Sequence, residues 1–180
     1  MKRIFFTMLV LFAGNLGQVQ AQAMFAGWDQ FCGIRVVVQP NPQTATATMD
    51  QFGPVIIVDP GAMGNWTVSR VFTLAHECAH HKLGHVIAAG RWSMPHAIVK
   101  RELQADCWAA RALVNTAYYR DLQRMIYQFA QQGPYRRGGY PSGVERAQTV
   151  ARCAGLNFRR PMATPIPRQV PRVPMSNRCM

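Results

Sequence analysis

Short runs of β-branched residues dominate the pattern of apolar positions in the first third of the chain. They lie at 34–38 and 55–58, and turn-forming Pro, Asn and Gly residues follow each of them, so both runs predict strands. An Ala/Thr-rich segment at 44–49 is expected to add a strand with small side chains. This part of the chain therefore predicts a small β-sheet.

Beyond residue 66 the apolar positions recur with a helical period. The pattern predicts helices over about 67–82, 97–115, 117–132 and 142–153, with a loop at 85–95 after Gly84. In the third helix an apolar stripe, formed by Leu122, Met125, Ile126 and Phe129, is expected to face the core. Strands followed by a majority of helices indicate an α+β, helix-dominated fold.

The two ends of the chain differ from the middle. Residues 1–23 have a basic start, an apolar stretch and a small-residue cleavage site, which together predict a secretory signal peptide. No second long apolar run follows, so we expect an exported protein, periplasmic or secreted, with no transmembrane span in the mature chain. The remaining chain predicts one domain over 24–156.

Residues 157–180 predict a basic, extended and disordered tail rather than part of the fold. This segment holds five arginines, five prolines and no acidic residue, a composition typical of disordered chain. The whole protein carries a formal net charge of +12 and an isoelectric point near 10.4. Such charge favours anionic partners, for example an envelope polymer bound through the tail, although a merely solubilising tail is the alternative. The tail lacks the interleaved aromatic residues typical of single-strand nucleic-acid binders.

One motif suggests chemistry, the sequence His76-Glu77-Cys78-Ala79-His80 in the first predicted helix. Residues four apart share a helix face, so His76 and His80 can present two imidazole nitrogens to one Zn²⁺. Glu77 would then lie beside the metal, where its carboxylate can accept a proton from zinc-bound water and pass it to a leaving amine.

A third ligand can be sought in two ways. A metzincin requires Gly and His at positions that Leu83 and Val86 occupy here, so that route fails. The other route takes a carboxylate from the next helix, where Glu102 is available. Asp106 lies one helical turn further on the same face, and it can hold the far N–H of a zinc-bound histidine.

These residues resemble known peptidases. His-Glu-x-x-His followed by Glu-x-x-x-Asp resembles the gluzincins, and residues 55–152 are similar to the CAAX prenyl endopeptidases with their soluble bacterial relatives, and to the neutral zinc metallopeptidases. The resemblance implies a zincin-like core, in which a small sheet flanks the His-Glu-x-x-His helix. It also implies one Zn²⁺ per chain on His76, His80 and Glu102, with Glu77 as catalytic base and Asp106 behind the ligands.

The prenyl endopeptidase group also carries His-Pro and, shortly after, Glu-Arg. The similar stretch here runs from Tyr140-Pro141 to Glu145-Arg146, so Tyr replaces His. A phenol can donate a hydrogen bond to a developing oxyanion, which makes Tyr140 a catalytic candidate; a packed aromatic residue is the alternative. The other histidines, His81, His85 and His96, are expected at the surface or around the site rather than as ligands, with nonspecific metal binding by His85 as the alternative.

Five cysteines, an odd number, leave at least one unpaired. Cys32 and Cys153 could tie the ends of the domain together. Cys78 and Cys107, on the two helices of the predicted zinc site, could pair behind the metal or stay buried as thiols. Cys179 lies in the basic tail.

The sequence thus predicts an exported zinc metalloendopeptidase that cleaves a peptide or protein substrate. Two alternatives remain open at this point. One is a non-proteolytic zinc-binding module that binds polyanions or cell-envelope polymers. The other is a zinc amidase that acts on cell-wall peptides.

Overall fold

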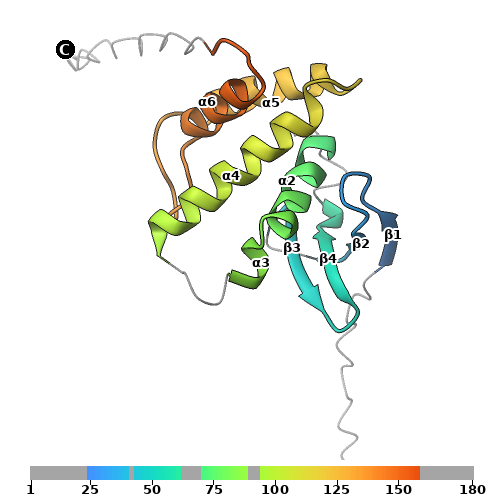
Figure 1. Cartoon of the computed structure of the whole chain (residues 1–180). Helices are drawn as coiled ribbons and strands as arrows, with labels where there is room; N and C mark the ends of the chain where they lie inside the picture. Colours follow the sequence, from blue (N-terminus) through green and yellow to red (C-terminus); the bar gives the residue numbers. More distant parts are fainter. Residues whose placement is uncertain (1–23, 41–42, 62–69, 89–93, 159–180) are drawn as a thin grey trace, which may run out of the picture.

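A four-stranded sheet and a group of helices make up the protein. A computed structural model describes residues 24–40, 43–61, 70–88 and 94–158 (Figure 1). The strands are β1 (Met24–Trp28), β2 (Arg35–Val38), β3 (Ala45–Asp50) and β4 (Gly53–Val58). The helices are α2 (Arg70–Lys82), α3 (His85–Ala88), α4 (Pro95–Leu113), α5 (Tyr119–Gln131) and α6 (Gly143–Cys153). The predicted α+β class is therefore confirmed.

The sheet has the order β1-β2-β4-β3. Its central pair, β2 and β4, is parallel, whereas β1 and β3 pair antiparallel with their neighbours and form the two edges. Sequence analysis did not predict β1, because Met24-Phe25-Ala26-Gly27-Trp28 has no β-branched residue and contains a glycine. The strand forms through its pairing with β2, and Gly27 adopts a φ of 112° at a bulge in that pairing.

Helix α2 lies between the sheet and the other helices (Figure 1). On the sheet side, Val36, Ile56 and Val58 form a buried cluster, against which Leu74 of α2 packs. On the other side a larger core joins α2, α4, α5 and α6. It contains Phe72, Leu113, Leu122, Met125, Phe129 and Val150, each at most 3% exposed. The predicted apolar stripe of the third helix is thus in the core, with Ile126 partly buried against it.

Helix boundaries follow local sequence signals. Gly84, which has a φ of 71°, terminates α2, and the short helix α3 follows where a loop was predicted. The start of α6 is confirmed: the Ser142 side chain accepts a hydrogen bond from the Glu145 backbone, and the Glu145 carboxylate accepts one from the Ser142 backbone. These reciprocal bonds hold the first turn of α6.

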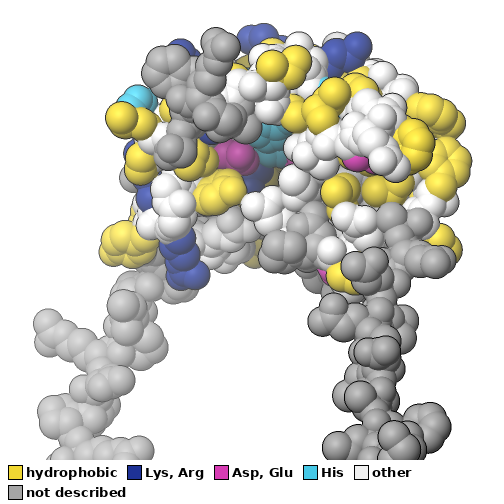
Figure 2. Space-filling model, turned by 90° about the horizontal axis from the view of Figure 1, so that it is seen from below, with side chains coloured by type: hydrophobic (Ala, Val, Ile, Leu, Met, Phe, Trp, Pro, Cys, Tyr) yellow, Lys and Arg dark blue, Asp and Glu magenta, His cyan; other side chains and the backbone are white. Residues whose placement is uncertain are grey.

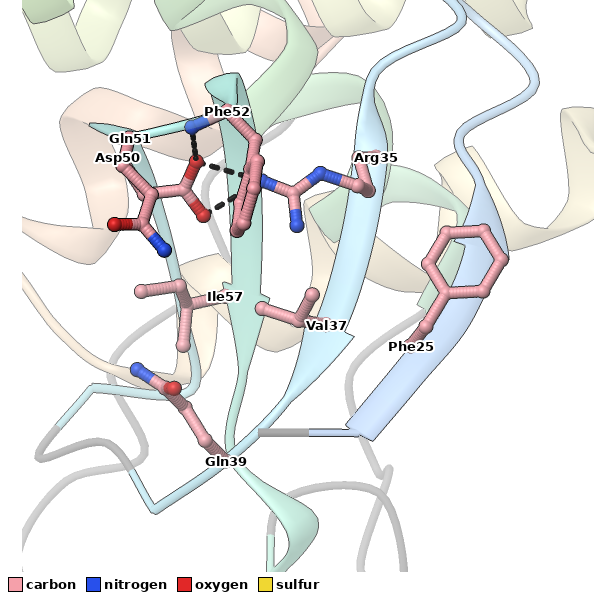
Figure 3. Close-up of a pocket in the computed structure, with 8 residues that line it drawn as sticks. All are labelled: Phe25, Arg35, Val37, Gln39, Asp50, Gln51, Phe52 and Ile57. Carbon is pink, nitrogen blue, oxygen red and sulfur yellow. Dashed lines mark hydrogen bonds and ion pairs between the residues drawn. The ribbon is translucent and has the colours of Figure 1, made fainter. Parts of the chain in front are cut away.

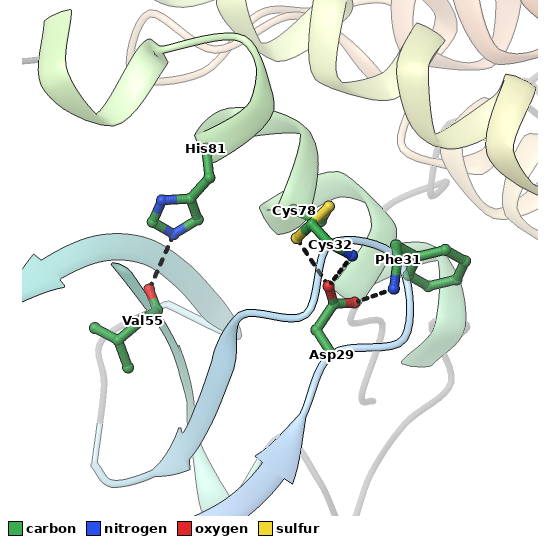
Figure 4. Close-up of a disulfide and its surroundings, with 6 residues drawn as sticks. All are labelled: Asp29, Phe31, Cys32, Val55, Cys78 and His81. Carbon is green, nitrogen blue, oxygen red and sulfur yellow. Dashed lines mark hydrogen bonds between the residues drawn. A yellow bond between two sulfur atoms is a disulfide. The ribbon is translucent and has the colours of Figure 1, made fainter. Parts of the chain in front are cut away.

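The two disulfides differ from the pairings considered in the sequence. Cys32 pairs with Cys78, and Cys107 with Cys153. The suggested Cys32–Cys153 and Cys78–Cys107 pairs are therefore wrong. The reason is the direction of each helix face: Cys78 faces the turn after β1 (Figure 4), while α4 packs Cys107 against α6. Cys179 lies outside the described residues.

The predicted signal peptide at 1–23 lies outside the described residues, as does the tail from residue 159 onward. The domain boundaries 24–156 stay a prediction; among the described residues, helices and strands run from Met24 to Cys153. Within the described ranges, no helix combines the length and apolar composition that a bilayer span requires.

Candidate metal centre

Helices α2 and α4 bring together three potential metal ligands. His76 and His80 come from α2, one helical turn apart, and Glu102 comes from the facing side of α4. The Nε2 atoms of the two histidines lie 3.1 Å apart. The Glu102 carboxylate oxygens lie 3.3 Å from His76 Nε2 and 3.7 Å from His80 Nε2. Figure 2 shows a hollow in which histidine and acidic side chains gather.

The spacing of these atoms fits a tetrahedral cation. With metal–ligand bonds near 2.0–2.1 Å, two ligands of a tetrahedral zinc ion are about 3.3 Å apart. The two nitrogens lie 3.1 Å apart, and the nearest Glu102 oxygen of each, Oε2 for His76 and Oε1 for His80, lies at 3.3 and 3.7 Å, all close to this value. These three side chains therefore lie close enough together to hold one metal ion.

Asp106 supports His76 from behind, as its place one turn after Glu102 predicted. Its Oδ1 accepts a hydrogen bond from His76 Nδ1 at 2.9 Å, so Nε2 is the nitrogen directed at the candidate site. Asp106 is fully buried, and Arg146 of α6 donates two hydrogen bonds to it, at 2.7 and 2.8 Å. Burial opposes ionisation of Asp106, but the charge and hydrogen bonds of Arg146 together with those of His76 outweigh burial and hold the pKa of Asp106 at about 2.

The ligands also influence one another's protonation. Burial disfavours a charged His76, yet hydrogen bonds to Asp106 and Glu102 outweigh burial and raise the His76 pKa to about 10. Burial and the charge of His76 lower the pKa of His80 to about 3. Burial opposes the ionised form of Glu102, but the hydrogen bond with His76 and the charges of His76, His80 and Arg146 together keep the Glu102 pKa below its usual value. A cation bound here would replace the proton of His76.

Glu77 lies beside this cluster and is not part of it. Its Oε2 accepts a hydrogen bond from the backbone N–H of Ala47 in β3 at 2.7 Å. Burial raises the pKa of Glu77, although the charge of His76 and the Ala47 bond oppose the shift. A carboxylate with a raised pKa is a better proton acceptor than a free one.

Tyr140 is the weakest of the predicted site residues. Its side chain is 44% exposed, and its hydroxyl accepts a hydrogen bond from Gln43 Nε2 at 3.4 Å, just before β3. Among the described residues it forms no hydrogen bond with His76, His80 or Glu102. Its role at an oxyanion stays a prediction.

The sequence did not predict the contacts that three residues, Arg146, His85 and Gln104, make around the ligands. Arg146 was noted only as part of the Glu-Arg pair, and the helix packing that brings it to Asp106 was not foreseen. His85 was placed around the site without a partner; it contacts His80, and Gln104 of α4 contacts His85 in turn. His81, by contrast, contacts the backbone carbonyl of Val55 in β4.

A second group of potential ligands lies on the far side of α2. It consists of Asp29, Cys32 and Cys78, but both sulfur atoms belong to the disulfide. The Asp29 carboxylate accepts hydrogen bonds from the backbone of Phe31 and Cys32, at 3.1 and 2.7 Å (Figure 4). This group therefore organises the turn after β1.

The outer face of the sheet carries a hollow of about 550 Å³ (Figure 3). Arg35 and Asp50 form an ion pair at one end of it, and the rings of Phe25 and Phe52 border it. None of the three candidate metal ligands lines this hollow.

Comparison of the chain with protein-family models, with curated proteins and with solved structures found no match. Any assignment of function therefore rests on the residues of the site described above.

Proposed function

We propose that this protein is an exported zinc-dependent metalloendopeptidase. The observation that carries the proposal is the convergence of His76 Nε2, His80 Nε2 and the Glu102 carboxylate, whose two oxygens lie 3.3 and 3.7 Å from these nitrogens, with Asp106 bonded to the other nitrogen of His76. Two nitrogens and one carboxylate, with a fourth position left open, are the ligand set of many catalytic zinc sites. One Zn²⁺ per chain is expected.

Bound Zn²⁺ would supply Lewis acidity, which polarises a carbonyl group and lowers the pKa of water. We assign proton transfer to Glu77. Glu77 follows His76 in the sequence, and burial raises the pKa of its carboxylate. This carboxylate would accept the proton of the attacking water and deliver it to the leaving nitrogen. Ala47 holds this carboxylate in place through its N–H.

The sheet suggests how a peptide would bind. β3 is an edge strand, and the N–H of Ala47 points away from β4 to Glu77. An extended peptide could therefore add to the free edge of β3 with its backbone close to the candidate base. Main-chain hydrogen bonds of this kind favour a peptide or protein substrate with little side-chain selectivity.

Export is supported by two features. The two disulfides are compatible with an oxidising compartment, and residues 1–23 have the composition of a signal peptide. The basic tail would bring the enzyme to an anionic envelope polymer.

Zinc content and cleavage of casein, measured together on purified wild type and variants, test the proposal. Wild type and Glu77→Gln should each contain one zinc, and Glu77→Gln should lose hydrolysis by roughly 10²–10⁴-fold. Glu102→Ala should lose zinc. His96→Ala, a change at an exposed histidine, is the control and should behave as wild type.

Three results would contradict the proposal in different ways. Hydrolysis retained by Glu77→Gln rejects the mechanism, and zinc retained by Glu102→Ala rejects the third ligand. If zinc binds as expected and casein stays intact, purified cell-wall peptides become the decisive substrate. Cleavage there indicates an amidase, and its absence indicates a non-proteolytic zinc-binding module.

A further inference from the structure

His85 is a buried histidine that the proposed reaction does not use. It begins the short helix α3, which follows the turn at Gly84, and it is only 8% exposed. Its Nδ1 lies 3.1 Å from Nδ1 of His80, and its Nε2 lies 3.2 Å from Oε1 of Gln104. A chain of hydrogen-bonding groups thus runs from α4 through α3 to the ligand on α2.

The chemistry of these groups gives the chain a direction. The Oε1 atom of Gln104 can only accept a hydrogen bond, so Nε2 of His85 carries the proton. Burial favours the neutral imidazole, in which the other nitrogen, Nδ1, is an acceptor. His80 must then donate from its own Nδ1.

This polarity leaves the correct nitrogen of His80 free for a metal. With the proton on Nδ1, the lone pair of His80 lies on Nε2, which faces His76 and Glu102. The reverse polarity would place a proton on Nε2, where a cation would have to bind. His85 itself contacts the opposite nitrogen of His80, so it lies outside the group of ligand atoms.

We propose that His85, held by Gln104, is a positioning residue that fixes the tautomer and ring orientation of His80 and thereby strengthens metal binding. The inference rests on the proposed zinc function. It gives His80 a support equivalent to the one that Arg146 and Asp106 give His76. The two ligands of α2 are thus oriented by separate partners, one charged and one neutral.

Partners of this kind typically change metal affinity by 10–100-fold. His85→Phe retains a ring of similar size and removes the acceptor, so its zinc dissociation constant should rise by about this factor. Gln104→Leu should weaken binding in the same direction, and Gln104→Glu, which retains an acceptor, should bind zinc more tightly than Gln104→Leu. Gln104 is exposed, so its replacement leaves the core intact even if His85→Phe fails to fold.

The experiment is a competition titration of the metal-free protein with Zn²⁺ and a chromophoric chelator, on wild type, the three variants and His96→Phe. His96→Phe is the matched control, since it makes the same change at an exposed histidine of α4. Absorption spectra of the Co²⁺-loaded proteins at saturating metal report the number of ligands. The expected spectra keep four-coordinate intensity in His85→Phe, because no ligand is lost.

Each outcome of this titration either supports or overturns the role of His85. Zinc affinities of His85→Phe and Gln104→Leu within about threefold of wild type, well below the effect expected of such partners, overturn the inference and leave the zinc function standing. A Co²⁺ spectrum of His85→Phe that shows a lost ligand also overturns it, because His85 would then coordinate the metal itself. If wild type binds no zinc, the proposed function fails and this inference fails with it.

Discussion

Replacing Arg146 by Met tests whether the buried Arg146–Asp106 pair stabilises the region behind the candidate ligands. Asp106 is 0% exposed, and Arg146 donates two hydrogen bonds to it. The variant leaves the carboxylate buried with His76 as its remaining partner. Loss of one partner from a buried ion pair costs about 3–5 kcal/mol. Arg146 also lies over the ring of Phe129, 4.0 Å from its centroid, and Met retains only part of that contact.

The assay is urea unfolding at pH 7 with a chelator present, so that metal binding does not contribute. We expect the free energy of unfolding of Arg146→Met to fall by about 3 kcal/mol, the low end of this range, because metal-free His76, with a pKa of about 10, remains a charged partner of Asp106. The chain offers a matched control in Arg136→Met, because Arg136 also forms a paired contact with a carboxylate, that of Glu145, but at the surface. Solvent screens the Arg136–Glu145 pair, so Arg136→Met should lower the free energy of unfolding much less than Arg146→Met.

Two results would refute the reasoning. If Arg146→Met and Arg136→Met destabilise the protein equally, burial does not determine the value of the pair. If Arg146→Met leaves the unfolding midpoint and slope unchanged, Asp106 is not held as a buried carboxylate. Arg146→Lys separates the effect of charge from that of geometry, because it retains the charge but loses the second hydrogen bond. Its free energy of unfolding should lie between those of wild type and Arg146→Met.

Three further predictions concern stability. The hydrogen bond with Arg136 lowers the pKa of Glu145 from 4.5 to about 2, although burial opposes this shift. Glu145→Gln should therefore destabilise the protein at pH 7. The difference in free energy of unfolding between wild type and this variant, measured in urea, should vanish as the pH falls through about 2. The Cys107–Cys153 disulfide closes a loop between residues 46 positions apart. Replacing both cysteines by Ser should lower the free energy of unfolding, measured by calorimetry, by about 4 kcal/mol. A decrease below about 1 kcal/mol would contradict this prediction. Gly143→Ala places a methyl group against the backbone carbonyl at the end of α5, so it should cost about 1–3 kcal/mol in thermal unfolding, and an unchanged melting temperature would reject the close approach.

Features that depend on near neighbours in the chain were predictable. The four-residue spacing of His76 and His80 needs only helical geometry to place both rings on one face. The spacing of Glu102 and Asp106 works in the same way on α4, so the candidate ligands and the residue behind His76 were found. The cap at Ser142 likewise depends on bonds within one turn.

The limits of the fold prediction have the same origin. The strands at 35–38, 45–50 and 53–58 follow runs of residues with β propensity, whereas β1 exists because β2 pairs with it. Strand order was not predictable either, since the parallel pairing of β2 with β4 places β3 at the edge. That edge position is what directs the N–H of Ala47 to Glu77.

By itself, the sequence determined the four longer helices, most of the strands and the candidate ligand types on each helix, because spacing along one element decides which side chains share a face. Only the tertiary structure decided which distant groups meet. Arg146 reaches Asp106 across 40 residues, and Cys32 joins Cys78 and not Cys153. Such contacts follow from how helices and strands pack, and packing depends on the whole set of side chains at each interface rather than on any local pattern.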